Sequence, residues 1–209
     1  MSIIKNYIED LQNTLNRLPL EAIEQVIQLL AEARVERKQV FIMGNGGSAA
    51  TASHFVCDLA KGTRHPSLPP FRAISLNDSI PIMLALANDE GYETVFASQL
   101  AAQANPGDLV ICISASGNSS NILRAAETAS QIPAVTVGFT GFDGGILSSL
   151  VDHHVHVPSN CIEHVEDIHL ALEHLICTAL REESRYMSSF EALSAVKGAI
   201  LEPAKPFHP

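Results

Sequence analysis

Apolar residues recur every three or four positions through the first part of the chain, and this spacing predicts two helices. The residues of the two apolar stripes are Ile4, Ile8, Leu11, Leu15 and Leu18, followed by Ile23, Val26, Ile27 and Leu30. Both helices, in residues 1–36, precede the first strand-like segment, and little else in this part of the chain could cover them. Packing onto the rest of the domain stays open, but we favour oligomer contacts, as in a helix bundle.

From residue 37 the pattern changes to short apolar runs that alternate with helix-like segments. The expected strands are residues 40–43, 71–76, 109–114, 134–139 and 154–157, and the expected helices are residues 48–61, 80–87, 94–103, 119–130 and about 164–185. This alternation predicts an α/β domain over residues 37–186, with a doubly wound five-stranded parallel sheet flanked by helices. Strands that are apolar throughout are typical of sheets covered on both faces. Residues 187–209 are expected to form a C-terminal tail.

The composition fits one folded domain and excludes several classes of protein. The 209 residues are 46% hydrophobic, which argues against disorder. The chain has 13 basic and 23 acidic residues, whereas a general nucleic-acid binder needs a basic face. No apolar run approaches the roughly 18 residues of a membrane span, and the N-terminus lacks the pattern of a signal peptide. The four cysteines form no C-x-x-C pair, so we expect free thiols in a reducing cytoplasm.

Two loops combine glycines, serines and the start of a helix at the carboxyl ends of predicted strands. They are Gly44-Asn45-Gly46-Gly47-Ser48 and Ser114-Ala115-Ser116-Gly117-Asn118-Ser119-Ser120. Ligands of doubly wound sheets bind beyond these ends. Glycines let the backbone approach a ligand, and helix N-termini offer free N–H groups with a partial positive charge. Because neither loop contains lysine or arginine, the pair predicts a neutral cradle for the phosphate of a small phosphorylated metabolite.

Two other interpretations of these loops stay open. The spacing Gly44-x-Gly46-x-x-Ala49 matches the dinucleotide-binding fingerprint, but the acid expected at the end of the second strand is missing, since Asn77 and Asp78 lie beyond it. Serine-rich loops can also simply cap helices. Two such loops on neighbouring strands favour the binding function.

Histidines and acids on two predicted helices form a candidate metal site. His54 and Asp58 are four residues apart and therefore share a helix face. On the long last helix, Glu166 and His174 point within roughly 80° of each other, whereas His169 lies on the far side of Glu166. The same segment also offers Glu163, Asp167 and Glu173. The set His54, Asp58, Glu166 and His174 would suit zinc or another divalent ion, and the alternative is a solvated polar face.

Five segments, in one order, resemble the sugar isomerase (SIS) domain family and in particular its phosphoheptose isomerases. They are GNGGSAATASHFVCDL, LANDEGYE, ISASGNSSNILRAAE, TGFDGG and VEDIHLALEHLIC, and the similarity covers roughly residues 3–183. The resemblance implies a parallel sheet in flavodoxin-like order. It implies an aldose–ketose isomerase that converts sedoheptulose 7-phosphate to D-glycero-D-manno-heptose 7-phosphate through a metal-assisted cis-enediolate. It also implies a homotetramer with active sites at subunit interfaces.

The resemblance further implies roles for individual residues. The implied substrate and phosphate contacts are Asn45, Gly46, Gly47, Ser48, Asn88, Asp89, Ser114, Ser116 and Ser119, with Ala115 inside the phosphate loop. His54 and His174 match metal-binding histidines, and His174 is also placed for acid–base work. We expect Asp58 to move the proton between C1 and C2, with Glu166 as the substitute base.

Three positions depart from the family's usual pattern. The family usually has glutamate at Asp58, glutamine at Glu166 and threonine at Ala115. Asp58 is one methylene shorter, Glu166 adds a negative charge, and Ala115 removes a hydroxyl. Another phosphosugar substrate therefore stays open. A non-catalytic SIS protein that binds a phosphosugar, or a partner protein such as a replication initiator, is a further alternative, which the retained His54 and His174 disfavour.

Overall fold

The computed structural model describes the backbone of residues 2–201 and the side chains of residues 2–182. Its centre is a parallel five-stranded sheet with the order β2-β1-β3-β4-β5. The strands are β1 (Gln39–Gly44), β2 (Arg72–Ser75), β3 (Leu109–Ile113), β4 (Val135–Thr140) and β5 (His153–His156). The doubly wound sheet in flavodoxin-like order is thus confirmed, and the strand order reverses between β1 and β3.

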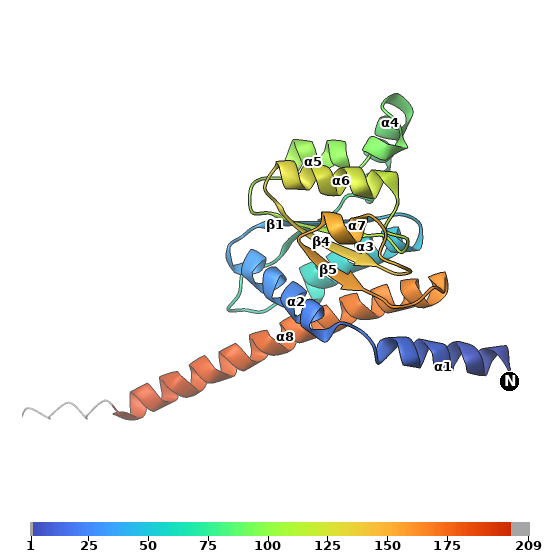
Figure 1. Ribbon diagram of the computed structural model, residues 1–209. Coiled ribbons are helices and arrows are strands. Elements are labelled where there is room, and N and C mark those ends of the chain that lie inside the picture. Colours follow the sequence, from blue (N-terminus) through green and yellow to red (C-terminus); the bar gives the residue numbers. More distant parts are fainter. Residues whose placement is uncertain (1, 202–209) are drawn as a thin grey trace, which may run out of the picture.

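Helices cover both faces of this sheet (Figure 1). They are α1 (Ile3–Leu15), α2 (Leu20–Val35), α3 (Gly47–Cys57), α4 (Ile80–Asp89), α5 (Ala97–Gln103), α6 (Ser120–Gln131), α7 (Leu147–Leu150) and α8 (Ile162–Leu201). A π-helical turn, η1 (Asp58–Gly62), continues α3, and a 3-10 turn, η2 (Tyr92–Thr94), precedes α5. Among the described residues, no helix is both long enough and apolar enough to cross a membrane.

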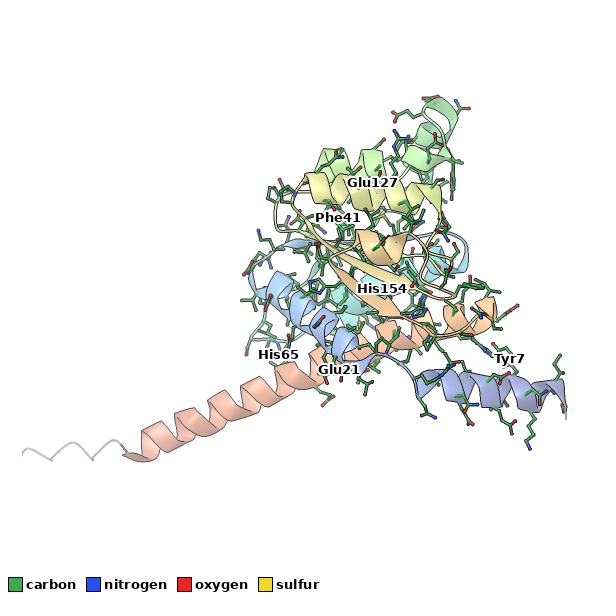
Figure 2. All side chains as sticks on the ribbon, viewed as in Figure 1. Tyr7, Glu21, Phe41, His65, Glu127 and His154 are labelled. Carbon is green, nitrogen blue, oxygen red and sulfur yellow. The ribbon has the colours of Figure 1, made fainter. Side chains whose placement is uncertain are left out.

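Alternate residues of the central strands enter two separate hydrophobic cores. Val40 and Ile42 of β1 pack into the core formed with α2, α3 and α8. Phe41 and Met43 pack into the core formed with α5, α6 and α7, and Figure 2 labels Phe41 near that helical layer. Because the side chains of a strand alternate between faces, both sets had to be apolar. This double burial explains the uninterrupted apolar runs in the sequence.

The first helix leaves much of its apolar stripe open. Ile4 is 69% exposed and Ile8 is 49% exposed, and Thr14 is the residue of α1 that is buried. In Figure 1, α1 projects away from the sheet. The α4 helix also projects from the body in Figure 1, and none of its residues is buried.

The last helix differs from its expected length. It was expected to end near residue 185, but α8 continues to Leu201. Proline is the strongest helix breaker, and none occurs in this helix before Pro203, just beyond its end. Residues 187–201 of the expected tail are therefore helical, and residues 202–209 lie outside the described part of the chain.

Candidate active site

A cleft opens at the carboxyl ends of β1 and β3, where the strand order reverses. Its lining comes from both glycine- and serine-rich loops and from the first turns of α8: Asn45, Ser48, Ile113, Ser114, Ala115, Ser116, Ser119, Ile162 and Glu166. The structure therefore brings together the two loops that the sequence placed on neighbouring strands. The serine and asparagine side chains in this lining are neutral donors for an anion, and Glu166 is its one charged residue.

The first loop is shaped by close packing around Gly44. A Cβ atom on Gly44 would lie 2.6 Å from the backbone of Ser48, so the chain can turn into α3 only with glycine at this position. The side chain of Asn77 binds both backbone polar groups of Gly44. Its Nδ2 donates to the Gly44 carbonyl at 2.8 Å, and its Oδ1 accepts from the Gly44 N–H at 3.2 Å. Asn77 thus fixes the turn itself, at the strand end where a dinucleotide site would carry an acid.

The second loop is hydrogen-bonded to the segment that follows β4. Gly117 has a φ of +64°, and its carbonyl accepts a hydrogen bond from the Leu147 N–H at 3.0 Å. The Asn118 side chain accepts from the Ile146 N–H at 3.1 Å and donates to the Ser116 carbonyl at 3.0 Å. These contacts hold the serines on a rigid support at the N-terminal end of α6, an arrangement that suits a phosphate.

A cluster of four side chains joins α3 and η1 to α8. It consists of His54, Asp58, Glu173 and His174, whose ligand atoms all lie within 4.8 Å of one another. The Nε2 atoms of His54 and His174 are 3.2 Å apart, and each lies 3.3 Å from Oε1 of Glu173. The Nε2 atom of His54 is also 3.8 Å from Oδ2 of Asp58. The π-helical turn begins at Asp58, where the Thr63 N–H donates to the Asp58 carbonyl five residues back.

Glu173 is the unusual member of this cluster. Its side chain is fully buried, and neither carboxylate oxygen has a hydrogen-bond partner in the described structure. Burial, followed by the negative charge of Asp58, raises the pKa of Glu173 to about 8. A buried carboxylate in this state needs either a proton or a cation.

The four groups fit a divalent cation such as zinc. Imidazole nitrogens and carboxylate oxygens are zinc ligands at about 2.1 Å, and ligands at that distance in a tetrahedron lie about 3.4 Å apart. The separations between His54 and each of the other three groups and between His174 and Glu173 are 3.2 to 3.8 Å, close to that value, and all four ligand atoms lie within 4.8 Å of one another. The orphaned carboxylate of Glu173 would gain the positive partner that it lacks.

The expected metal set differs from this cluster in one member. Glu166 was expected beside His54, Asp58 and His174, but the structure has Glu173 there. Glu166 instead lines the phosphate cleft, with its carboxylate against Gly47. His169, the histidine that the helix geometry set apart, is fully buried, and burial lowers its pKa to about 4.

Two expected substrate contacts lie elsewhere. Asn88 and Asp89 form the exposed end of α4, where the Asn88 side chain donates to the Asp89 carboxylate at 2.7 Å. They are not among the residues that line the cleft in the described structure. Beyond Glu173, residues that sequence reasoning missed are Asn121 and Tyr92, whose side chains bind Asn45.

Comparison with known proteins agrees with this geometry. Residues 6–141 match the SIS domain family. A phosphoheptose isomerase of Geotalea daltonii is 36% identical over 182 residues, which cover 86% of this chain and 94% of that protein. One from Helicobacter pylori is 38% identical over 172 residues, which cover 82% and 88%. The chain belongs to the SIS domain family. Among solved SIS structures, a phosphoheptose isomerase from Francisella tularensis superposes with a TM-score of 0.78 at 31% identity, covering 86% of this chain and 96% of that one.

Proposed function

We propose that this protein is a phosphoheptose isomerase, which interconverts sedoheptulose 7-phosphate and D-glycero-D-manno-heptose 7-phosphate. The observation that carries the proposal is that the serine-lined phosphate cleft and the histidine–carboxylate cluster share two elements, because α3 with its π turn and α8 contribute residues to both. The phosphoheptose isomerases among its relatives support the choice of substrate.

The cleft binds the phosphate end of the sugar. The Ser114, Ser116 and Ser119 hydroxyls and the N-terminal end of α6 donate to the phosphate oxygens, and Asn45 and Ser48 contact the sugar. Because the phosphate is remote from the reacting carbons, its binding energy is used to orient them.

The cluster acts at the carbonyl end. A divalent cation, for which we infer zinc, would be held by His54, Asp58, Glu173 and His174, and it would supply polarisation of the substrate carbonyl. Asp58 carries the proton between C1 and C2, whereas Glu166, expected from the sequence as the substitute base, lines the phosphate cleft instead. His174 moves the proton between the two oxygens of the cis-enediolate through the ring nitrogen that would not bind the cation, because a coordinated nitrogen has no lone pair for a proton.

The active protein is a homotetramer in the cytoplasm. The exposed apolar stripe of α1 supports assembly through the N-terminal helices, which would bring subunits together beside the active sites. The four cysteines are all free thiols, which supports a reducing compartment.

Turnover of sedoheptulose 7-phosphate by the purified protein with added zinc tests the proposal. We expect conversion that His174→Ala reduces at least about 100-fold, because proton transfer by a positioned group is lost. His153→Ala on β5 is the matched control and keeps full activity. A folded protein that binds the sugar phosphate without converting it would contradict the isomerase and support a phosphosugar-binding regulator. Preferred turnover of a different phosphosugar would overturn the substrate assignment alone.

A further inference from the structure

The side-chain amide of Asn45 is held by two residues outside the phosphate loops. The Asn45 Nδ2 donates to Oδ1 of Asn121 at 2.8 Å, and the Asn121 Nδ2 donates back to Oδ1 of Asn45 at 2.9 Å. The hydroxyl of Tyr92 donates to the same Asn45 Oδ1 at 2.8 Å. Asn45 is thus hydrogen-bonded to α6 through Asn121 and to η2 through Tyr92.

Counting donors and acceptors shows what is left of this amide. An amide oxygen has two lone pairs, and both of those on Asn45 are taken, by Tyr92 and by Asn121. The amide nitrogen has two hydrogens, and one of them is used by Asn121. The group that Asn45 can still offer is therefore one N–H. Since Asn45 lines the cleft, that N–H is available to an oxygen atom of a ligand.

Both supporting residues are well placed to hold a fixed geometry. Asn121 lies in the first turn of α6 and is only 2% exposed. Tyr92 is 53% exposed, but its segment is anchored, because Gly91 turns the chain with a φ of +98° and Val95 and Phe96 are fully buried just after η2. Asn121 also follows the serine loop directly, so the pair ties the two phosphate loops to each other.

We propose that Tyr92 and Asn121 are positioning residues, which fix the Asn45 amide so that it presents an N–H to an oxygen of the bound sugar phosphate. This inference rests on the proposed function, because the ligand is the substrate of the same cleft. Without Tyr92, the Asn45 oxygen has a free lone pair, and only the hydrogen-bonded pair with Asn121 holds the amide, which can turn to present its oxygen when the Asn121 amide turns with it. The lone pairs of a substrate oxygen would then face an acceptor for part of the time.

Removal of the Tyr92 hydroxyl tests the proposal without touching the cleft. We expect Tyr92→Phe to raise KM for sedoheptulose 7-phosphate about five-fold, the scale of one lost hydrogen bond, with kcat changed less than about two-fold. Tyr7→Phe is the matched control, since the Tyr7 hydroxyl binds Asp167 away from the cleft, and it leaves both constants unchanged. Melting temperatures verify that each variant is folded. Asn121→Asp, which loses the N–H that returns to Asn45, raises KM in the same direction if it folds.

A double-mutant cycle separates positioning from a general structural role. If Tyr92 acts through Asn45, then Tyr92→Phe added to Asn45→Ala produces no further rise in KM. An unchanged KM in Tyr92→Phe, or an effect that persists in full on the Asn45→Ala background, overturns the proposal.

Calorimetric titration with sedoheptulose 7-phosphate distinguishes this failure from failure of the proposed function. If the unsubstituted protein binds the sugar phosphate but does not turn it over, the isomerase falls, and weaker binding by Tyr92→Phe still supports the positioning role. If the unsubstituted protein neither binds nor converts the compound, both inferences fall.

Discussion

The carboxylate of Glu166 occupies the space that a side chain on Gly47 would need. A Cβ atom on Gly47 would be 2.5 Å from Oε2 of Glu166, closer than two such atoms can approach. The contact joins α8 to the first residue of α3, where a negative charge is favoured by the unpaired N–H groups of the helix. Any side chain at position 47 therefore has to displace Glu166 from the cleft.

Substitution of Gly47 by alanine is expected to act through Glu166. The clash involves the far end of a flexible side chain, and Gly47 does not have a positive φ, so the melting temperature stays close to that of the unsubstituted protein. We expect kcat/KM to fall roughly 10-fold because a misplaced side chain disturbs the bound sugar. Steady-state kinetics of Gly47→Ala and of the Gly47→Ala/Glu166→Ala pair measures this. A full 10-fold loss on the Glu166→Ala background would show that Glu166 is not the intermediary.

Metal content should depend on Glu173 and not on Glu166. We expect Glu173→Gln to lower zinc affinity by at least about 10-fold, since it removes a charged ligand from the cluster. Glu166→Gln is the matched control, because it makes the same change seven residues earlier on the same helix, and it keeps its zinc. Elemental analysis and competition with a chromophoric chelator measure both. Loss of zinc from Glu166→Gln alone would restore the metal set expected from the sequence.

The stability of the metal-free protein should fall as pH rises through the range set by Glu173. The pKa of Glu173 is raised to about 8 in the folded state, whereas the pKa of glutamate in the unfolded chain is about 4.3. The folded state therefore holds the proton more tightly. Below the unfolded pKa, Glu173 does not lower the free energy of unfolding. Between that pKa and about pH 8 the free energy of unfolding decreases as pH rises, and at higher pH the Glu173 contribution no longer changes. Urea unfolding between pH 5 and 9 in the presence of a chelator measures this trend.

The control for that experiment is Glu173→Gln, which cannot ionise. His169, whose pKa is lowered to about 4, contributes in the opposite sense, because stability rises with pH between the folded and unfolded pKa of a buried neutral histidine. The difference between the unsubstituted protein and Glu173→Gln cancels the His169 contribution. A difference that does not change with pH would contradict the buried-carboxylate interpretation.

Assembly should depend on the open stripe of α1. We expect Ile4→Glu combined with Ile8→Glu to convert the proposed tetramer into smaller species, because charged side chains would have to be desolvated at the contact. Turnover is expected to fall with the tetramer, since the proposed sites lie at subunit interfaces. Val35→Glu, at an exposed apolar position off the stripe, is the control. Sedimentation velocity at matched concentrations measures the assemblies, and an unchanged tetramer in the double variant would exclude α1 as its main contact.

Hydrophobic periodicity was sufficient to predict the sheet. The central strands β1, β3 and β4 are buried and leave continuous apolar runs, whereas the edge strands β2 and β5 are shorter and partly exposed; all five were located to within two residues of their observed bounds. Helix ends were less certain, because nothing local in the sequence distinguishes α8 beyond residue 185 from a tail. The adjacency of the two phosphate loops could not be read from chain order alone, because β2 lies between β1 and β3 in the sequence; it depends on the reversal of strand order between β1 and β3.

The choice between Glu166 and Glu173 could not be made from the sequence. The two residues are seven positions apart, so they project from α8 within about 20° of each other and differ mainly by about 10 Å along the helix axis. Only the packing of α3 against α8 decides which of the two heights lies opposite His54. The network around Asn45 was equally invisible, because its three members come from three separate segments of the chain.

One helix carries both ends of the proposed site. Glu166 borders the phosphate cleft and His174 stands in the histidine cluster, and the helical rise separates them by about 12 Å along the axis of α8. A continuous helix cannot shorten that interval, so α8 fixes the separation between the phosphate cleft and the histidine cluster. A substrate that contacts both ends has to span this interval, which makes chain length a criterion of selection before stereochemistry is read at all.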